Sequence, residues 1–161
     1  RFTEKIKNEG LKVRLSFPDA GAAALAKRDC PSLSESIFTF KDLLSDEYVI
    51  PVEDIIIAVS PQNYDYDEYQ SLCNKHTGCI IMVNGRLEDP MVGIGSVARE
   101  RRRGFVSSWN NIFWLQPLEK GALMRTYPDD WILYKLDTDG YRFLKTFVRK
   151  PESELLIEEL V

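Results

Sequence analysis

The chain has 161 residues, of which 44% are hydrophobic and 29% are charged, and its formal net charge at pH 7 is −4. This length is enough for a folded domain with its own core, and this composition excludes a disordered chain. The acidic balance argues against a nucleic-acid binder, and the apolar runs are too short for a transmembrane span. We expect a single α/β domain over residues 1–150 and an acidic tail or short helix over residues 151–161.

A strand and a capped helix are predicted at the start of the chain. Residues 11–17 (LKVRLSF) alternate between apolar and polar side chains, which predicts a half-buried strand ended by Pro18. Asp19 then precedes an alanine-rich segment, and we expect its carboxylate to accept a hydrogen bond from the first turn of a helix. Apolar residues at helical spacing predict a further helix over residues 34–45.

Two apolar runs that flank a helical segment predict the centre of the sheet. Residues 55–59 (IIIAV) and 79–83 (CIIMV) are continuously apolar, as in strands that are covered on both faces. Residues 63–78 carry acidic side chains near their start and basic ones near their end, which is typical of a helix. The order strand, helix, strand predicts a right-handed crossover and parallel pairing of two central strands.

The hydrophobic period changes to two from Phe105 onward. Four alternating segments separated by turn signals predict an antiparallel meander, with Trp109 and Trp114 in its first strand and a hairpin loop that ends at Gly140. Trp131 opens the third strand, and we expect it to cover one end of the core. The predicted fold is therefore a three-layer α/β domain. Its mixed sheet has a parallel βαβ core that the C-terminal antiparallel meander extends.

The three cysteines are sparse and odd in number, which is typical of a reducing compartment and not of a disulfide scaffold. Cys73, His76 and Cys79 are separated from one another by two residues each, a spacing that metal ligands can have. A tetrahedral site needs a fourth ligand, and Cys30 lies far away in the sequence. We therefore expect no bound metal.

A glycine motif raises an alternative function. Gly93, Gly95 and Ala98 formally match the dinucleotide-binding fingerprint in its alanine variant. That fingerprint needs a strand that runs directly into the first glycine, whereas Pro90 lies just before it here. The acidic residue expected about twenty positions later could only be Glu119, in a predicted turn. A nucleotide-binding or enzymatic Rossmann-like domain therefore remains the alternative.

The strongest local charge in this acidic chain is a cluster of arginines in a helix predicted over residues 96–103. Its members are Arg99, Arg101, Arg102 and Arg103. One interpretation is a solvated helix face. The other is a docking face for an acidic patch on a partner protein or for anionic lipid headgroups, because guanidinium groups bind carboxylates and phosphates.

Three segments carry a resemblance to a known family. They are VRLSFPDAG, VGIGSVARERR, and WLQPLEKGALMRTYP followed two residues later by Trp131. Their order and spacing over about residues 13–148 resemble a plant, algal and cyanobacterial family catalogued as a domain of unknown function. That family includes the chloroplast low photosystem II accumulation type protein. Gly85 after Asn84 departs from the family, where proline is expected.

The resemblance implies a role in photosynthesis and no catalytic residues. On this basis we expect a non-catalytic plastid protein without a cofactor, at the stromal face of the thylakoid membrane in the chloroplast. Its expected partner is a photosystem or another thylakoid protein complex, which it would bind as an assembly factor or peripheral subunit.

Overall fold

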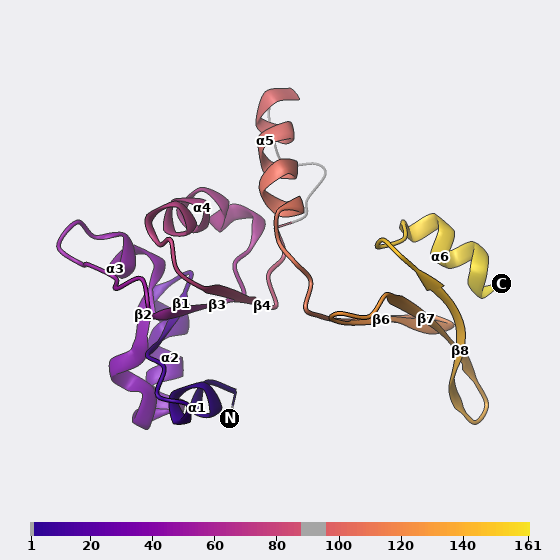
Figure 1. The fold of residues 1–161 in the computed structure, drawn as a ribbon, viewed down its shortest axis with the longest axis horizontal. Helices are drawn as coiled ribbons and strands as arrows, with labels where there is room; N and C mark the ends of the chain where they lie inside the picture. Colours follow the sequence, from indigo (N-terminus) through magenta and orange to yellow (C-terminus); the bar gives the residue numbers. More distant parts are fainter. Residues whose placement is uncertain (1, 88–95) are drawn as a thin grey trace. The chain divides into compact units, whose positions relative to one another are not determined.

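The computed structural model describes residues 2–87 and 96–161, with the side chains of Phe2 and of residues 96–99 left out. It divides the chain into two compact units, Arg1–Val106 and Ser107–Val161, which are described separately (Figure 1). The family resemblance runs through both units, and the expected single domain over residues 1–150 stays a prediction. In the described part of the chain, no helix has the length and apolar character needed to cross a membrane.

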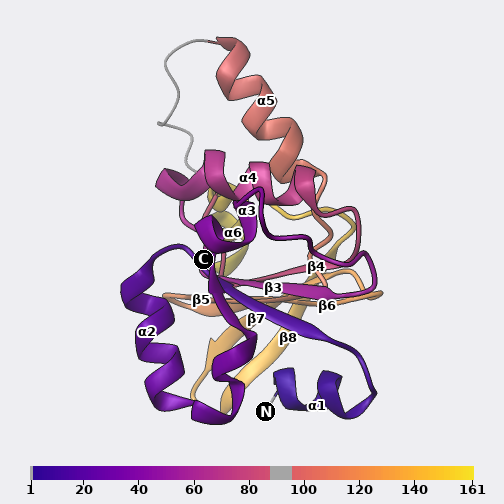
Figure 2. The ribbon, with the colours of Figure 1, turned by 90° about the vertical axis from the view of Figure 1, so that its left-hand side faces the viewer.

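The first unit is a parallel sheet with helices on both faces. Its elements are α1 (Phe2–Asn8), β1 (Val13–Phe17), α2 (Ala20–Asp29), β2 (Ile37–Thr39), α3 (Phe40–Leu44), β3 (Ile55–Val59), α4 (Tyr66–Lys75), β4 (Ile80–Val83) and α5 (Ser96–Ser107). The strand order is β2-β1-β3-β4, and every pair is parallel. Figures 1 and 2 show α1 and α2 on one side of this sheet and α3 and α4 on the other, so three layers are present.

Alternating residues of β1 form part of the core on one face of the sheet. Val13 and Leu15 are buried against Ala23 of α2 and Ile57 of β3, which together form one cluster of the core. The expected cap of α2 is confirmed, since Oδ1 of Asp19 accepts a hydrogen bond of 2.9 Å from the backbone N–H of Ala22.

The prediction of two adjacent parallel strands is confirmed, but one of them is not central. Ile57 of β3 pairs with Ile81 of β4, and β1 lies on the other side of β3. Within the described sheet β4 is an edge strand, as β2 is on the other side, and all four of its residues are half-buried. A continuous apolar run indicates that helices cover both faces of a strand, and it does not indicate how many strands flank it.

The predicted helix over residues 34–45 is wrong in its first half. A 3₁₀ turn (Pro31–Ser36) and strand β2 precede a short helix, because Ile37 and Phe38 pair with β1. Thr39 then starts α3 by accepting a hydrogen bond of 3.1 Å from Asp42 N–H, while the Asp42 carboxylate accepts one of 2.7 Å from Thr39 N–H. Strand pairing therefore overrides the helical period of the apolar residues.

The second unit is an antiparallel sheet with a helix on one face. Its elements are β5 (Phe113–Leu118), β6 (Gly121–Thr126), β7 (Trp131–Asp137), β8 (Gly140–Phe147) and α6 (Ser153–Leu160). The strand order is β5-β6-β7-β8 with antiparallel pairing throughout, so the predicted meander is confirmed.

The meander does not extend the parallel sheet, as we had expected, but forms a sheet of its own. The physical reason is that this sheet has its own cover: Leu156 and Leu160 of α6 pack on Leu123, Trp131 and Leu133. Residues 151–161 therefore include a helix that completes a core.

The start of the meander also differs from the prediction. Helix α5 continues to Ser107, so Phe105 is helical, and β5 begins only at Phe113. Trp109 lies between these elements, outside any strand, whereas Trp114 is in β5 as expected. The pattern around Phe105 is compatible with a strand and with a helix. The segment forms a helix because Phe105 then packs on α4.

Candidate functional site

Two aromatic contacts fix α5 against α4. The guanidinium carbon of Arg102 lies 4.2 Å from the centre of the Tyr66 ring, which is the geometry of a cation–π interaction. The Phe105 ring meets the rings of Tyr66 and Tyr69 edge-on, with centroids 5.5 Å and 6.1 Å apart. Arg102 and Phe105 are one turn apart and therefore share the side of α5 that faces α4.

The Tyr66 phenol contributes to this contact in its neutral form. Burial raises its pKa, and the positive charge of Arg102 acts in the opposite direction without overcoming the effect of burial. Arg102 is thus held by the ring face of a neutral tyrosine. Of the predicted partner-binding arginines whose side chains the structure describes, Arg102 is the one in a packing role.

Arg101 and Arg103 are exposed, and neither forms an ion pair with another described residue. They point about 160° apart around the helix axis, since successive residues of an α-helix are rotated by about 100°. Arg99 belongs to the same helix, but its side chain lies outside the described ones. The structure therefore does not gather Arg101 and Arg103 on one face; they flank the side that packs on α4.

A buried polar cluster at the amino-terminal end of the parallel sheet was not predicted. Arg14 of β1 forms a hydrogen bond of 2.6 Å from Nε to Oδ2 of Asp54, which immediately precedes β3. Its guanidinium group also donates to the Tyr48 hydroxyl and lies 5.1 Å from the centre of that ring. Nε2 of His76 lies 3.0 Å from the backbone carbonyl oxygen of Asp54, to which it donates.

This polar cluster connects the strands of the sheet to one another and to α4. Asp54 and His76 are almost completely buried, and they join β1, β3 and the end of α4. In doubly wound α/β folds, ligands bind at the carboxyl ends of the strands, which is the opposite end of the sheet. The only sequence signal was the lone histidine, because an Arg–Asp pair that is separated by 40 residues has no local pattern.

The carboxyl ends of β3 and β4 contain two unusual backbone conformations. Ser60 and Asn84 have φ values of 52° and 53°, in the left-handed region that non-glycine residues rarely adopt. Ser60 N–H donates to the Val83 carbonyl oxygen at 2.7 Å, and Arg86 N–H donates to the Pro61 carbonyl oxygen at 2.8 Å. These bonds hold both strand ends in register.

The residues of the predicted dinucleotide fingerprint are not brought together with this edge. Gly93 and Gly95, with Pro90, lie outside the described residues, and Ala98 is in α5. Glu119, the acidic residue that the fingerprint would need, lies at the turn between β5 and β6 in the second unit.

The cysteines do not share a common environment. Cys30 and Cys79 are exposed, whereas Cys73 is half-buried in α4, where burial raises its pKa to about 11. His76, which has the spacing of a ligand between Cys73 and Cys79, donates to Asp54. Among residues 2–87 and 96–161, no group of three or more side chains is arranged to hold a metal ion.

Comparison with known protein families shows which family the chain belongs to. A family model described as a domain of unknown function, DUF1995, matches residues 1–157. The chain belongs to the DUF1995 family. The match runs across both units, and it confirms that the chain is a member of an uncharacterised domain family. No curated protein matches the chain.

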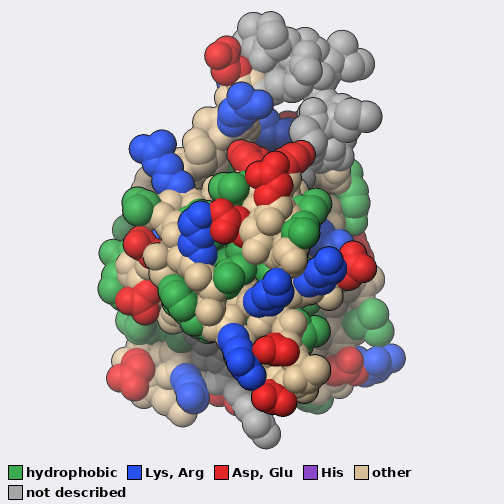
Figure 3. Space-filling model, turned by 90° about the vertical axis from the view of Figure 1, so that its right-hand side faces the viewer, with side chains coloured by type: hydrophobic (Ala, Val, Ile, Leu, Met, Phe, Trp, Pro, Cys, Tyr) green, Lys and Arg blue, Asp and Glu red, His purple; other side chains and the backbone are tan. Residues whose placement is uncertain are grey.

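The second unit of the DUF1995 domain has a mixed surface on the side that carries β8 and α6. Figure 3 shows hydrophobic side chains there, separated by lysines, arginines and acidic residues, so that no single sign of charge dominates. Lys145 of β8 forms an ion pair with Glu159 of α6 on this unit. A pocket of ≈ 360 Å³ lies along α6, next to the turn between β5 and β6. Its lining consists of Leu118, Glu119, Lys120, Ser153, Leu156, Ile157, Leu160 and Val161.

Proposed function

We propose that this DUF1995 domain is a non-catalytic binding module that docks on an acidic surface through α5. The observation that carries this proposal is that Arg101 and Arg103 are exposed while Arg102 and Phe105 anchor the same helix to α4. A helix that is anchored on one side and presents an arginine on each flank is suited to recognise carboxylates, because each guanidinium group can bind a carboxylate with two parallel hydrogen bonds.

The proposed location is the stromal side of a photosynthetic membrane complex in the chloroplast. The support for it is the resemblance of three segments to the family of the low photosystem II accumulation type. One of these segments, VGIGSVARERR, contains Arg99, Arg101 and Arg102. The protein then acts as an assembly factor or peripheral subunit of that complex, and anionic lipid headgroups are a second source of negative charge at the same surface.

Two arginines alone would bind weakly. An exposed ion pair contributes about 0–1 kcal/mol, so apolar contacts must supply the larger part of the binding free energy. The charge contribution is nevertheless measurable, since exposed charges are screened over about 8–10 Å at physiological ionic strength. Binding is therefore expected to weaken as salt is added.

The test is the double reversal Arg101→Glu/Arg103→Glu, which leaves the packing of Arg102 intact. The matched control is Lys27→Glu/Arg28→Glu, which changes the same amount of charge on two exposed residues of α2. We expect the first variant, and not the control, to lose sedimentation with thylakoid complexes at low salt. Vesicles of anionic lipid, assayed in parallel, separate lipid binding from binding to protein. Equal sedimentation of both variants and the parent at low and high salt would show that these arginines are only a solvated face.

A second function, nucleotide binding, is favoured by the topology of the first unit. The strand order β2-β1-β3-β4 reverses its direction between β1 and β3, which is where doubly wound sheets bind ligands. The left-handed Ser60 lies at the carboxyl end of β3, beside this point. Calorimetric titration with ATP and with NAD tests it, and tight binding of either would favour this function over the docking module.

A further inference from the structure

Among the described residues of the second unit, α6 packs on one face of the antiparallel sheet and no helix packs on the other. Cross-strand pairs share a face, and the pairs Leu115↔Met124, Met124↔Ile132 and Tyr134↔Phe143 alternate with the residues that pack on α6. We call this surface the outer face. It consists of Phe113, Leu115, Pro117, Ala122, Met124, Thr126, Ile132, Tyr134, Leu136, Tyr141, Phe143 and Thr146.

Much of the outer face is in contact with solvent. The exposed fractions are 60% for Phe113 and Leu115, 46% for Leu136, 56% for Tyr141 and 64% for Phe143. These five side chains expose on the order of 500 Å² of apolar surface, given that an aromatic side chain buries about 150–250 Å² when fully covered. With the half-buried centre of the sheet added, the area approaches the roughly 800 Å² per partner of a stable interface.

A β-bulge brings two of the aromatic residues onto this surface. The register shifts between Leu133, which pairs with Lys145, and Tyr134, which pairs with Phe143, so that Leu144 is the extra residue. Without the shift, Phe143 would share the face of Lys145 and Phe147, toward α6. The bulge therefore adds Tyr141 and Phe143 to the outer face.

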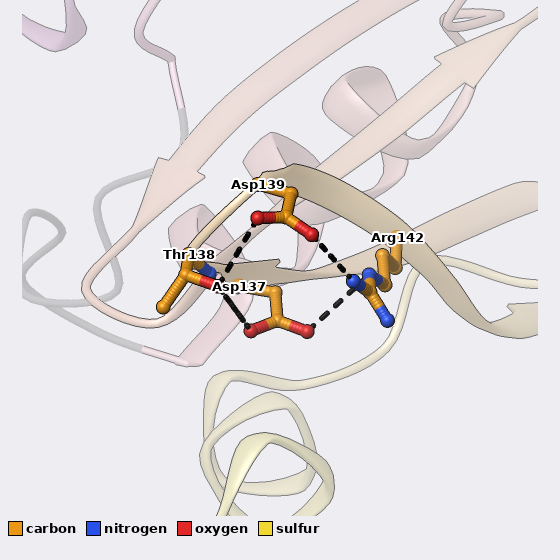
Figure 4. Close-up of polar contacts among 4 residues, drawn as sticks. All are labelled: Asp137, Thr138, Asp139 and Arg142. Carbon is orange, nitrogen blue, oxygen red and sulfur yellow. Dashed lines mark hydrogen bonds and ion pairs between the residues drawn. The ribbon is translucent and has the colours of Figure 1, made fainter.

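The outer face carries no charged residue, and the charges next to it pair with one another. At the tip of the β7–β8 hairpin, Nε of Arg142 lies 3.3 Å from Oδ2 of Asp137, and its Nη2 lies 3.1 Å from Oδ2 of Asp139 (Figure 4). Residues 107–161 contain seven basic and nine acidic side chains, a net charge of −2. This balance disfavours an anionic membrane as the partner, and it gives little repulsion between two copies of the unit.

The edges of the sheet are protected against pairing with another strand. Pro117 in the edge strand β5 cannot donate a backbone hydrogen bond. The other edge strand, β8, carries Arg142 and Lys145 together with the bulge, and both features are common on edges that avoid pairing. Association through this sheet is therefore expected face to face and not edge to edge.

We propose that the outer face packs against the outer face of a second copy of this chain, as two sheets of a β-sandwich. The surface is large enough, uncharged and rich in Phe, Tyr and Met, which are enriched at interfaces. A neutral surface can contact its own symmetry copy without opposing like charges, as a two-fold dimer requires. This interface is separate from the arginines of α5, so the proposal does not depend on the proposed function.

The test uses the whole chain and measures its mass in solution by sedimentation equilibrium over a series of concentrations. We expect the parent to have twice the mass of one chain. The variant Leu115→Glu/Phe143→Glu should raise the dissociation constant by at least about tenfold, since a carboxylate facing an apolar partner is desolvated without a counter-charge. The matched control is Ile157→Glu, an exposed apolar position on α6, which should remain dimeric.

A charge-swap experiment distinguishes a lost interface from a variant that fails to fold. Mixing the Glu variant with Leu115→Lys/Phe143→Lys should restore a dimer of the two variants, which a merely unfolded protein could not form. Tryptophan fluorescence of each variant reports whether the second unit is folded. A parent that is monomeric at every concentration overturns the proposal, and so does a dimer that the Glu variant leaves intact. A monomeric parent that loses binding to a thylakoid complex in the Glu variant would assign the outer face to a different protein.

Discussion

Single side chains in the first unit are expected to set how its stability responds to alkaline pH. Burial raises the pKa of the Cys73 thiol from 9.0 to about 11 and also raises the pKa of Tyr69. Both residues belong to α4, and both are neutral in the native state at physiological pH. The folded chain therefore holds these protons more tightly than the unfolded chain does.

The first prediction follows from the sign of this shift. The contribution of Cys73 is fully present below its unfolded pKa of 9.0 and is lost as pH rises through about 11. We expect the free energy of unfolding of the parent to fall over this pH interval, and to fall less in Cys73→Ala. Urea unfolding at a series of pH values measures both. Parallel pH profiles for the two proteins would contradict the assignment to Cys73.

The second prediction concerns the Arg14–Asp54 pair. The Asp54 side chain is 1% exposed and that of Arg14 19%, so removing the carboxylate leaves a largely buried positive charge. Asp54→Ala is expected to lower the free energy of unfolding by about 3–5 kcal/mol. The double variant Arg14→Met/Asp54→Leu should recover most of that loss, because both charges are then gone. Chemical denaturation of the two variants measures the difference, and equal losses would show that the pair is not the cause.

In helix α6, neighbouring positions lie in the core and on the surface. Leu156 and Leu160 are buried against the antiparallel sheet, whereas the adjacent Ile157 is 67% exposed. Gly121 of β6 lets this packing be close, because a Cβ there would lie 2.1 Å from the Tyr134 carbonyl oxygen and 2.9 Å from Cδ2 of Leu160.

The third prediction compares neighbouring positions on α6. Leu156→Ala should lower the free energy of unfolding by about 2–5 kcal/mol, since it leaves a cavity under the helix. Ile157→Ala, with a side chain of similar size on the exposed side, should change it by about 0.5 kcal/mol or less. Denaturant titrations followed by tryptophan fluorescence measure both. Similar effects of the two substitutions would mean that α6 does not pack on the sheet through Leu156.

The sequence predicted elements well where the pattern was local. The Asp19 cap, the parallel pairing of β3 with β4 and the antiparallel meander all follow from neighbouring residues. It failed where distant residues decide. Strand β2 forms because Ile37 pairs with Leu15, and α5 extends through Phe105 because Tyr66 and Tyr69 receive its ring. The arginines of the candidate site are recognisable in the sequence as a charge cluster. That Arg102 packs while Arg101 and Arg103 are exposed follows from the position of α4 and could not be predicted from the cluster.

At the scale of the whole molecule, the chain has two compact units with chemically distinct probes. All three cysteines lie in Arg1–Val106, and all three tryptophans lie in Ser107–Val161. Each unit also has a buried cluster of its own, with Val13 and Ile57 in the first unit and Leu123 and Trp131 in the second. Thiol reactivity therefore reports on one unit and tryptophan fluorescence on the other.

The fourth prediction uses both probes on one variant. Trp131 is 1% exposed and its ring lies 5.9 Å from that of Trp114, so Trp131→Ala should destabilise the second unit by about 3–5 kcal/mol. We expect the fluorescence transition from the remaining tryptophans to move to lower urea. The denaturant dependence of Cys73 alkylation should stay unchanged. A shift of both transitions by the same amount would show that the two units unfold as one.

The bulge at Leu144 makes the surface of the second unit depend on the number of residues in the turn between β7 and β8. A deletion of one residue in that turn, such as Thr138, would let Leu144 pair with Tyr134 without a register shift, turning Tyr141 and Phe143 toward α6 and Arg142 toward the opposite side. The same amino acids in the same order would then give that half of β8 a charged outer surface in place of an aromatic one. A change of length by one residue, and not a change of composition, would decide whether the sheet presents an apolar surface to another molecule.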